Sequence, residues 1–130
     1  MAIIKKVINK LIKKNISISV AESCTGGLIA NTITKYSGVS KIFSYGIISY
    51  SNKAKSKYLS VSKSNLSKFG AVSKEVAEDM INGLHKNEKT KICISTTGIA
   101  GPNGGTKLKP VGLVYICLLY TSPSPRDSRV

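Results

Sequence analysis

The chain has 130 residues, of which 42% are hydrophobic and 20% charged; these values are typical of one globular domain and exclude global disorder. No apolar run approaches the roughly 18 residues of a membrane-spanning helix, and one His with three scattered Cys argues against a zinc site, so we expect a cytoplasmic protein without metal, cofactor or membrane partner. The net charge of +14 comes from 18 Lys and two Arg, and because a surface selected for phosphate normally uses Arg, it favours lysine-rich codon usage over a nucleic-acid partner.

Helical and strand patterns alternate along the chain. The expected elements are a helix over 2–14, a strand over 16–20, a helix over 25–36, a strand over 43–50, a short helix over 51–58, a weaker helix over 61–69, a helix that begins after Ser73, a strand over 91–95, a glycine-rich loop over 96–110 and a strand over 111–119. This alternation predicts an α/β protein built as a three-layer α/β/α sandwich.

The composition changes abruptly near residue 119. The segment 119–130 (LYTSPSPRDSRV) holds both Arg and two of the four Pro, and it follows the apolar run of a predicted buried strand. We expect a domain over 1–118 that is incomplete at its C-terminal end, followed by a tail over 119–130. The tail is either disordered native sequence or, as its likeness to translated vector read-through favours, non-native sequence. An apolar strand exposed at such an edge would promote homo-oligomers.

The segment AESCTGG at 21–27 connects a predicted strand to a predicted helix. A hydroxyl at this position lies beside the N–H groups of the helix N-terminus, which suits a nucleophile with an oxyanion site or a phosphate cradle. Ser23 or Thr25 could instead serve only as a helix cap, and Cys24 is a weaker candidate nucleophile. Glu22 is the only acidic residue in the first 74 positions, and it either binds a Lys or a substrate hydroxyl or lies on the surface.

Two further segments carry residues suited to chemistry. In YSNKAK at 50–55, a desolvated Lys could act as a general base, unless both Lys are solvated surface charges. On one helix, Lys53 and Lys55 point about 200° apart, so only one of them can face Ser23. In the segment 96–105, four Gly allow the backbone to approach an anion, although a flexible loop is the alternative.

Together these segments resemble the C-terminal domain of the CinA (competence/damage-inducible protein) family, whose activity is nicotinamide-nucleotide amidase. The matching stretches, in family order, are AESCTGG at 21–27, GIISYSNKAK at 46–55, GAVSKEVAEDM at 70–80, TGIAGPNGG at 97–105 and KPVGLVY at 109–115. The resemblance covers most of residues 10–118. It implies an α/β/α fold and the hydrolysis of nicotinamide mononucleotide to nicotinate mononucleotide and ammonia, by a Ser–Lys mechanism without a metal.

The resemblance also implies roles for individual residues. Ser23 matches the family's nucleophile, Lys55 the recurring Lys that would act as its base, and Tyr50 a residue that would bond the base or the substrate. The N–H groups around Thr25 to Gly27 would hold the oxyanion. The residues expected to contact the substrate are Glu22, Thr25, Gly26, Gly27, Thr97, Gly98 and Gly101.

The chain departs from the family pattern in two respects. Family members continue past the VGLVY-type strand with another strand and a helix that carries a functional Arg, whereas residues 119–130 stand in that place here. The chain also begins at the amidase helix, as in the stand-alone form. A non-catalytic nucleotide-binding module is therefore an alternative function. A nucleic-acid-binding protein is a further one, although aromatic residues make up only 6% and Trp is absent, so base-stacking platforms are scarce.

Overall fold

The computed structural model describes residues 2–121. The elements are, in chain order, α1 (Ala2–Lys14), β1 (Ile18–Glu22), α2 (Leu28–Thr34), the 3-10 helix η1 (Val39–Lys41), β2 (Phe43–Ile48), α3 (Asn52–Leu59), α4 (Lys63–Phe69), α5 (Lys74–Asn87), β3 (Ile92–Gly98) and β4 (Val114–Tyr120).

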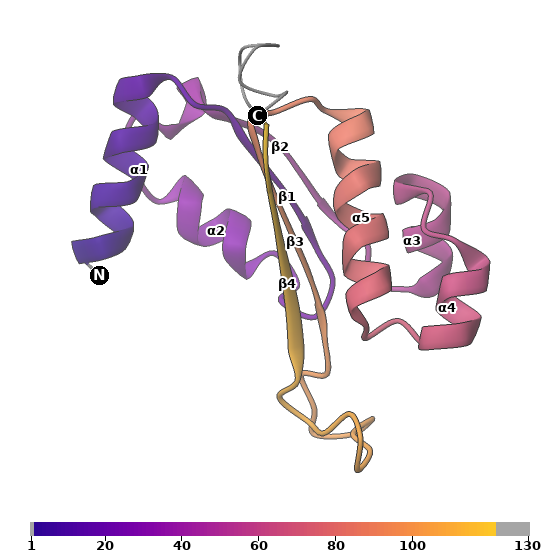
Figure 1. The fold of residues 1–130 in the computed structure, drawn as a ribbon. Coiled ribbons are helices and arrows are strands. Elements are labelled where there is room, and N and C mark those ends of the chain that lie inside the picture. The colour runs from indigo at the N-terminus through magenta and orange to yellow at the C-terminus, as the bar shows by residue number, and fades with distance from the viewer. Residues whose placement is uncertain (1, 122–130) are drawn as a thin grey trace.

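The four strands form one sheet in the order β2-β1-β3-β4. Strand β1 runs parallel to β2 and β3, and β4 is antiparallel to β3. Helices α1 and α2 cover one face of the sheet, and α3, α4 and α5 cover the other (Figure 1). This arrangement confirms the predicted α/β/α sandwich. It also places the carboxyl ends of the three parallel strands, where sites of such folds form, at one edge of the sheet.

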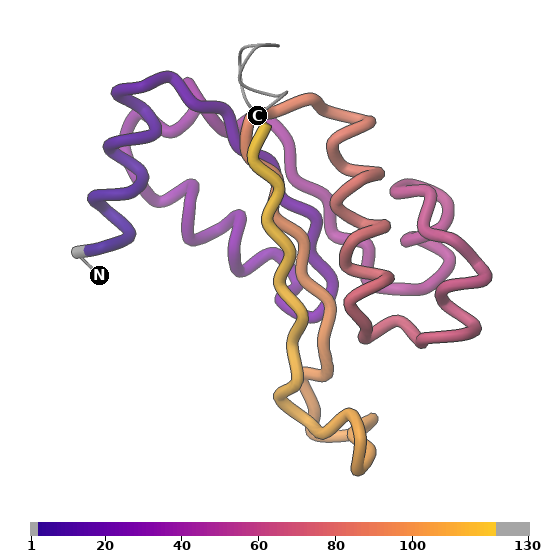
Figure 2. Tube along the Cα trace, viewed as in Figure 1, coloured from indigo at the N-terminus to yellow at the C-terminus, as the bar shows by residue number. Residues whose placement is uncertain are grey.

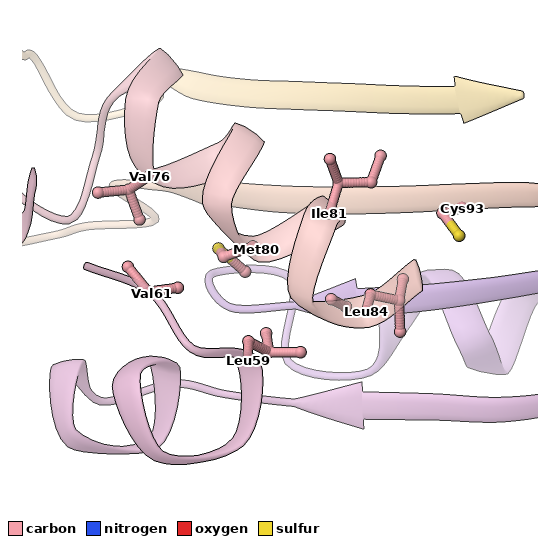
Figure 3. Packing of buried hydrophobic residues seen from close by; sticks show 8 residues of the cluster. Leu59, Val61, Val76, Met80, Ile81, Leu84 and Cys93 are labelled. Carbon is pink, nitrogen blue, oxygen red and sulfur yellow. The ribbon is translucent and has the colours of Figure 1, made fainter. Parts of the chain in front are cut away.

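The core between the sheet and α5 rests on the apolar face of that helix. Val76, Met80 and Leu84 are spaced as on one helix face and are fully buried. Figure 3 shows them in one cluster that also contains Leu59 and Cys93. Ser73 begins the helix by accepting a hydrogen bond from the Val76 N–H. A second cluster packs α1 and α2 onto the opposite face of the sheet; it contains Ile8, Leu11, Ile18, Val20, Ile33, Val39 and Ile42.

Two predicted boundaries were wrong in ways that affect the site. Helix α2 begins at Leu28, not at residue 25, because Gly26 and Gly27 have φ values of +58° and +102°, which a right-handed helix cannot contain. Strand β3 continues through Gly98, because Thr96 and Thr97 pair with β4 and are buried. Neither Thr therefore belongs to the glycine-rich loop.

Strand β4 forms one edge of the sheet and reaches Tyr120, so the first two residues of the predicted tail belong to the strand. Its end is fixed by a hydrogen bond from the Thr121 N–H to the Lys91 carbonyl, beside the start of β3 (Figure 2). Ile116 and Leu118 are 71% and 66% exposed on one side. The remainder of the tail, residues 122–130, lies outside the described residues. None of the helices within 2–121 combines the length and apolarity needed to cross a membrane.

Candidate active site

A buried Ser–Lys pair lies at the carboxyl edge of the sheet. Ser23 follows β1 directly, and Lys55 lies in the first turn of α3, whose start is fixed by the Ser51 hydroxyl accepting from the Ala54 N–H at 3.0 Å. The Lys55 Nζ donates to Ser23 Oγ at 2.9 Å and to the Tyr50 carbonyl oxygen at 2.8 Å. Lys55 is 1% and Ser23 5% exposed. The pair therefore meets away from bulk water.

Burial determines the protonation of this lysine. Desolvation lowers the pKa of Lys55 below its ordinary value of 10.5, while the nearby Cys24 thiol acts weakly in the opposite direction. Among the described residues no carboxylate pairs with the Lys55 ammonium. Lys53 is exposed on the opposite side of α3, which confirms the predicted orientation of the two lysines. The neutral amine is thus easier to reach for Lys55 than for a lysine in water.

Tyr50 reaches this pair through its backbone only. Its side chain is 69% exposed, and its carbonyl oxygen accepts the second Lys55 hydrogen bond. The expected bond between Tyr50 and Lys55 is therefore present, but the backbone carbonyl makes it and not the side chain. The physical reason is the alternation of side chains along an extended segment: Ser49 is fully buried, so its neighbour points outward.

Glu22 caps helix α2, and it does not face a substrate as expected. The carboxylate is 1% exposed, and it accepts from Thr25 Oγ1 at 2.6 Å, from the N–H groups of Gly27 and Ile29 at 3.1 and 3.0 Å, and from the Ala30 N–H at 2.9 Å. Burial acts to raise the pKa of Glu22, but these hydrogen bonds outweigh it and lower the pKa below its ordinary value. The carboxylate thus holds the turn that carries Ser23.

The donors available to an oxyanion differ from those predicted. The Gly26 N–H donates to the Ser23 carbonyl at 3.1 Å and the Gly27 N–H to Glu22, so both glycines are occupied. Thr25 Oγ1 bonds Glu22 and Thr96. Within residues 2–121 the N–H groups of this turn that bond no oxygen are those of Cys24 and Thr25, which lie beside the Cys24 thiol. Of the expected donors, the Thr25 N–H thus remains, the two glycines do not, and the Cys24 N–H is added.

The last residue of β3, Gly98, touches the turn that carries Cys24. A Cβ added to Gly98 would lie 3.0 Å from Cys24 Sγ and 2.6 Å from the Leu113 carbonyl oxygen, so only Gly allows this approach. Thr97 does not face this space: it is 1% exposed, and its hydroxyl donates to the Ala71 carbonyl at 2.7 Å. Gly101 lies half-buried further along the loop, which extends beyond the end of the sheet (Figure 1).

Sequence reasoning missed two residues beside the pair. The Thr96 carbonyl accepts from the Ser23 N–H at 3.1 Å, which ties the backbone of Ser23 to β3. Ser49 is fully buried next to it, and its N–H donates to the Glu22 carbonyl at 2.8 Å. The available signal for both was a hydroxyl residue near the carboxyl end of a predicted strand. In the described part of the chain, no three His, Cys, Asp or Glu side chains gather as metal ligands would.

Comparison with known proteins places this geometry in a family. The family model described as "CinA C-terminal domain" matches residues 1–127. A CinA-like protein of Kosmotoga olearia is 59% identical over 112 residues, which cover 86% of this chain and 27% of that protein. The chain thus spans about a quarter of the length of the curated relatives it matches.

Solved structures share the fold. The competence/damage inducible protein CihA of Agrobacterium tumefaciens superposes with a TM-score of 0.84 at 38% identity, covering 90% of this chain and 73% of that one. The competence damage-inducible protein A of Klebsiella pneumoniae superposes with a TM-score of 0.85 at 29% identity and the same coverage. Since the family's sequence pattern spans nearly the whole chain and its structures share this sheet and its helices, the chain belongs to the CinA C-terminal domain family.

Proposed function

We propose that the chain is an amidohydrolase that converts nicotinamide mononucleotide to nicotinate mononucleotide and ammonia. The observation that carries this proposal is the 2.9 Å hydrogen bond between Lys55 Nζ and Ser23 Oγ, both of which are buried and, within residues 2–121, have no carboxylate partner. A serine hydroxyl becomes a nucleophile when an adjacent base takes its proton, and a desolvated Lys is such a base. The nucleotide substrate comes from the resemblance of the AESCTGG and YSNKAK stretches to the amidase family.

The chemistry runs in two halves through these residues. Neutral Lys55 takes the Ser23 proton while Ser23 Oγ bonds to the carboxamide carbon. When the C–N bond breaks, the departing nitrogen takes that proton from Lys55 and leaves as ammonia. Water then attacks the resulting ester with Lys55 again as base, and Ser23 recovers its proton as nicotinate mononucleotide leaves.

The backbone after Ser23 supplies the charge stabilisation that amide hydrolysis needs. The N–H groups of Cys24 and Thr25 bond no oxygen of the chain within residues 2–121, so they are available to the developing oxyanion. One donor of this kind contributes about 3 kcal/mol to the transition state. The Glu22 cap holds the turn in place without taking part in the reaction, because its oxygens are occupied by donors of the chain.

The loop after β3 is our candidate for the phosphate or ring end of the nucleotide. Gly98 brings this loop against Cys24, and Gly101 and Gly104 adopt φ values of +81° and +92°, which aim backbone N–H groups in directions that other residues rarely allow. The Lys109 ammonium donates to the Phe69 carbonyl oxygen, which ties the loop to the connection before α5.

Ammonia release from nicotinamide mononucleotide tests the proposal. We expect the 130-residue chain to release ammonia and Ser23→Ala to abolish release, while Cys24→Ala retains it as the matched control on the neighbouring residue. Loss in Cys24→Ala with turnover retained in Ser23→Ala would assign the nucleophile to the thiol and contradict the proposal.

Binding measurements separate the other functions. Calorimetric binding of nicotinamide mononucleotide without ammonia release would identify a nucleotide-binding module and contradict the amidase. Binding to random duplex DNA that weakens steeply with salt, without nucleotide binding, would identify a nucleic-acid-binding protein.

A further inference from the structure

Ser49 carries a buried hydroxyl without a partner. The residue is 0% exposed. Among the described residues, its Oγ is the one buried side-chain oxygen or nitrogen that makes no hydrogen bond. Buried polar groups are almost always hydrogen-bonded, so such an exception calls for a physical explanation. The backbone of Ser49 is well fixed, because its N–H donates to the Glu22 carbonyl at 2.8 Å.

The sheet places this hydroxyl beside the Ser–Lys pair. Glu22 of β1 pairs with Ile48 of β2, so the next residues, Ser23 and Ser49, are neighbours across the two strands. Two residues earlier, Ala21 and Ile47 both pack into the core under α5, and side chains two apart in a strand share a face. Ser49 therefore lies on the face from which Lys55 reaches Ser23. Tyr50, the next residue in the chain, supplies the carbonyl oxygen that accepts a hydrogen bond from Lys55.

Among the described residues, Lys55 has one hydrogen-bond partner fewer than its amino group can bind. An ammonium has three N–H donors, and a neutral amine has two donors and one lone pair. The structure gives Lys55 two acceptors, Ser23 Oγ and the Tyr50 carbonyl. In the reactive state the lone pair must point at the Ser23 hydroxyl to receive its proton, so the two remaining N–H groups need two other acceptors. Tyr50 provides one of them.

We propose that the Ser49 hydroxyl is the second of these acceptors and so positions the Lys55 amine for proton transfer. With its N–H groups bonded to the Tyr50 carbonyl and to Ser49 Oγ, the amine directs its lone pair at Ser23. After the transfer, the ammonium keeps both bonds and donates its new N–H toward the Ser23 oxygen. Ser49 does not touch the substrate; it acts through Lys55. This role rests on the proposed amidase function.

The proposal predicts a defined effect on Lys55 in the variant Ser49→Ala. A hydrogen bond from an ammonium is stronger than one from an amine, so losing the acceptor disfavours the charged form more. The pKa of Lys55 should therefore fall below its wild-type value. The Cys24 thiol, which is the titratable neighbour that affects Lys55, stays in place.

The experiment titrates Lys55 directly and measures turnover. Chains labelled with ¹³C at lysine Cε are titrated by NMR, and the Lys55 signal is assigned as the one missing from Lys55→Met. Ser49→Ala should lower the Lys55 pKa, shift the acid limb of kcat/KM to lower pH and reduce kcat about tenfold through misorientation. Ser49→Thr, which keeps the hydroxyl, should restore all three.

Ser95→Ala is the matched control. Ser95 is also fully buried, and its hydroxyl donates to the Ala77 carbonyl at 2.8 Å. Removing this hydroxyl therefore breaks a hydrogen bond that does not involve Ser23 or Lys55. It should lower stability more than Ser49→Ala and leave the Lys55 pKa and the acid limb in place. An unchanged Lys55 pKa in Ser49→Ala would overturn the proposal, and so would a loss of rate without a shift of the limb. A wild-type chain that releases no ammonia would refute the amidase instead, while the NMR titration still decides the role of Ser49.

Discussion

Replacing Glu22 by Gln tests whether the carboxylate holds together the turn that carries Ser23. The change keeps the shape of the side chain and removes its charge. In the native turn, Oε1 accepts three hydrogen bonds and Oε2 accepts one, from the Ala30 N–H. Gln can offer an oxygen at only one of these positions. With its oxygen at the Oε1 position, its NH₂ group faces the Ala30 N–H, donor against donor.

The expected loss of stability follows from these contacts. The Ala30 N–H loses its hydrogen bond to a charged acceptor, and the loss of such a bond costs about 1.5–3 kcal/mol of stability. The three remaining bonds change from charge-assisted to neutral, which roughly halves their strength. We therefore expect Glu22→Gln to lower the free energy of unfolding by about 4–7 kcal/mol, a large part of the 5–15 kcal/mol that is usual for a domain.

Denaturant unfolding followed by far-ultraviolet circular dichroism measures this loss. Glu78→Gln, at an exposed position of α5, is the control and should change stability by no more than about 0.5 kcal/mol. Because the pKa of Glu22 is lowered in the folded chain, the unfolded chain binds the proton more readily. The Glu22 contribution is thus complete above the ordinary value of 4.5 and is lost as the pH falls through the folded pKa, and Glu22→Gln should lack this part of the acid dependence. A Glu22→Gln chain as stable as Glu78→Gln would refute the reasoning.

Three further results are expected. Lys55→Met should remove most ammonia release at neutral pH, whereas Lys53→Met, which changes an exposed side chain, should keep it within a few-fold in the same assay. The pKa of Lys55 is lowered from 10.5, so the unfolded chain binds more protons between the folded value and 10.5; urea unfolding should show stability rising with pH over that window, and Lys55→Met should lack this part of the rise. Gly83→Ala would place a Cβ 1.8 Å from the Leu59 carbonyl oxygen and should cost about 3 kcal/mol or prevent folding, whereas Gly112→Ala, at φ +96° in open space, should cost only about 1–2 kcal/mol in the same unfolding assay.

Local patterns were sufficient to predict much of the fold. The α5 face of Val76, Met80 and Leu84 follows from helical spacing, and all three side chains are buried. The 100° step of a helix predicted that only one of Lys53 and Lys55 can face Ser23, and the resemblance to the family chose Lys55, which the structure places there. The three layers followed from the alternation of helices and strands.

The rest depended on contacts between distant segments. Thr96 and Thr97 looked like loop residues because the sequence does not reveal that β4 pairs with them across the glycine-rich segment. The role of Glu22 depended on the start of α2, whose N–H groups occupy its carboxylate. The exposure of the Tyr50 side chain depended on its place just after β2, where a shift of one residue exchanges a buried side chain for an exposed one. The partnerless hydroxyl of Ser49 is visible only when its three-dimensional surroundings are known.

Mass spectrometry of the acid-quenched reaction tests the Ser–Lys mechanism most directly. The chain is mixed with nicotinamide mononucleotide, quenched during the first turnover and digested, and the peptides are searched for the acyl group that remains after ammonia leaves. We predict an ester on Ser23 that forms with the release of ammonia, is absent from Ser23→Ala and forms much more slowly in Lys55→Met. An acyl group on Cys24, or ammonia release that persists in Ser23→Ala, would contradict the mechanism.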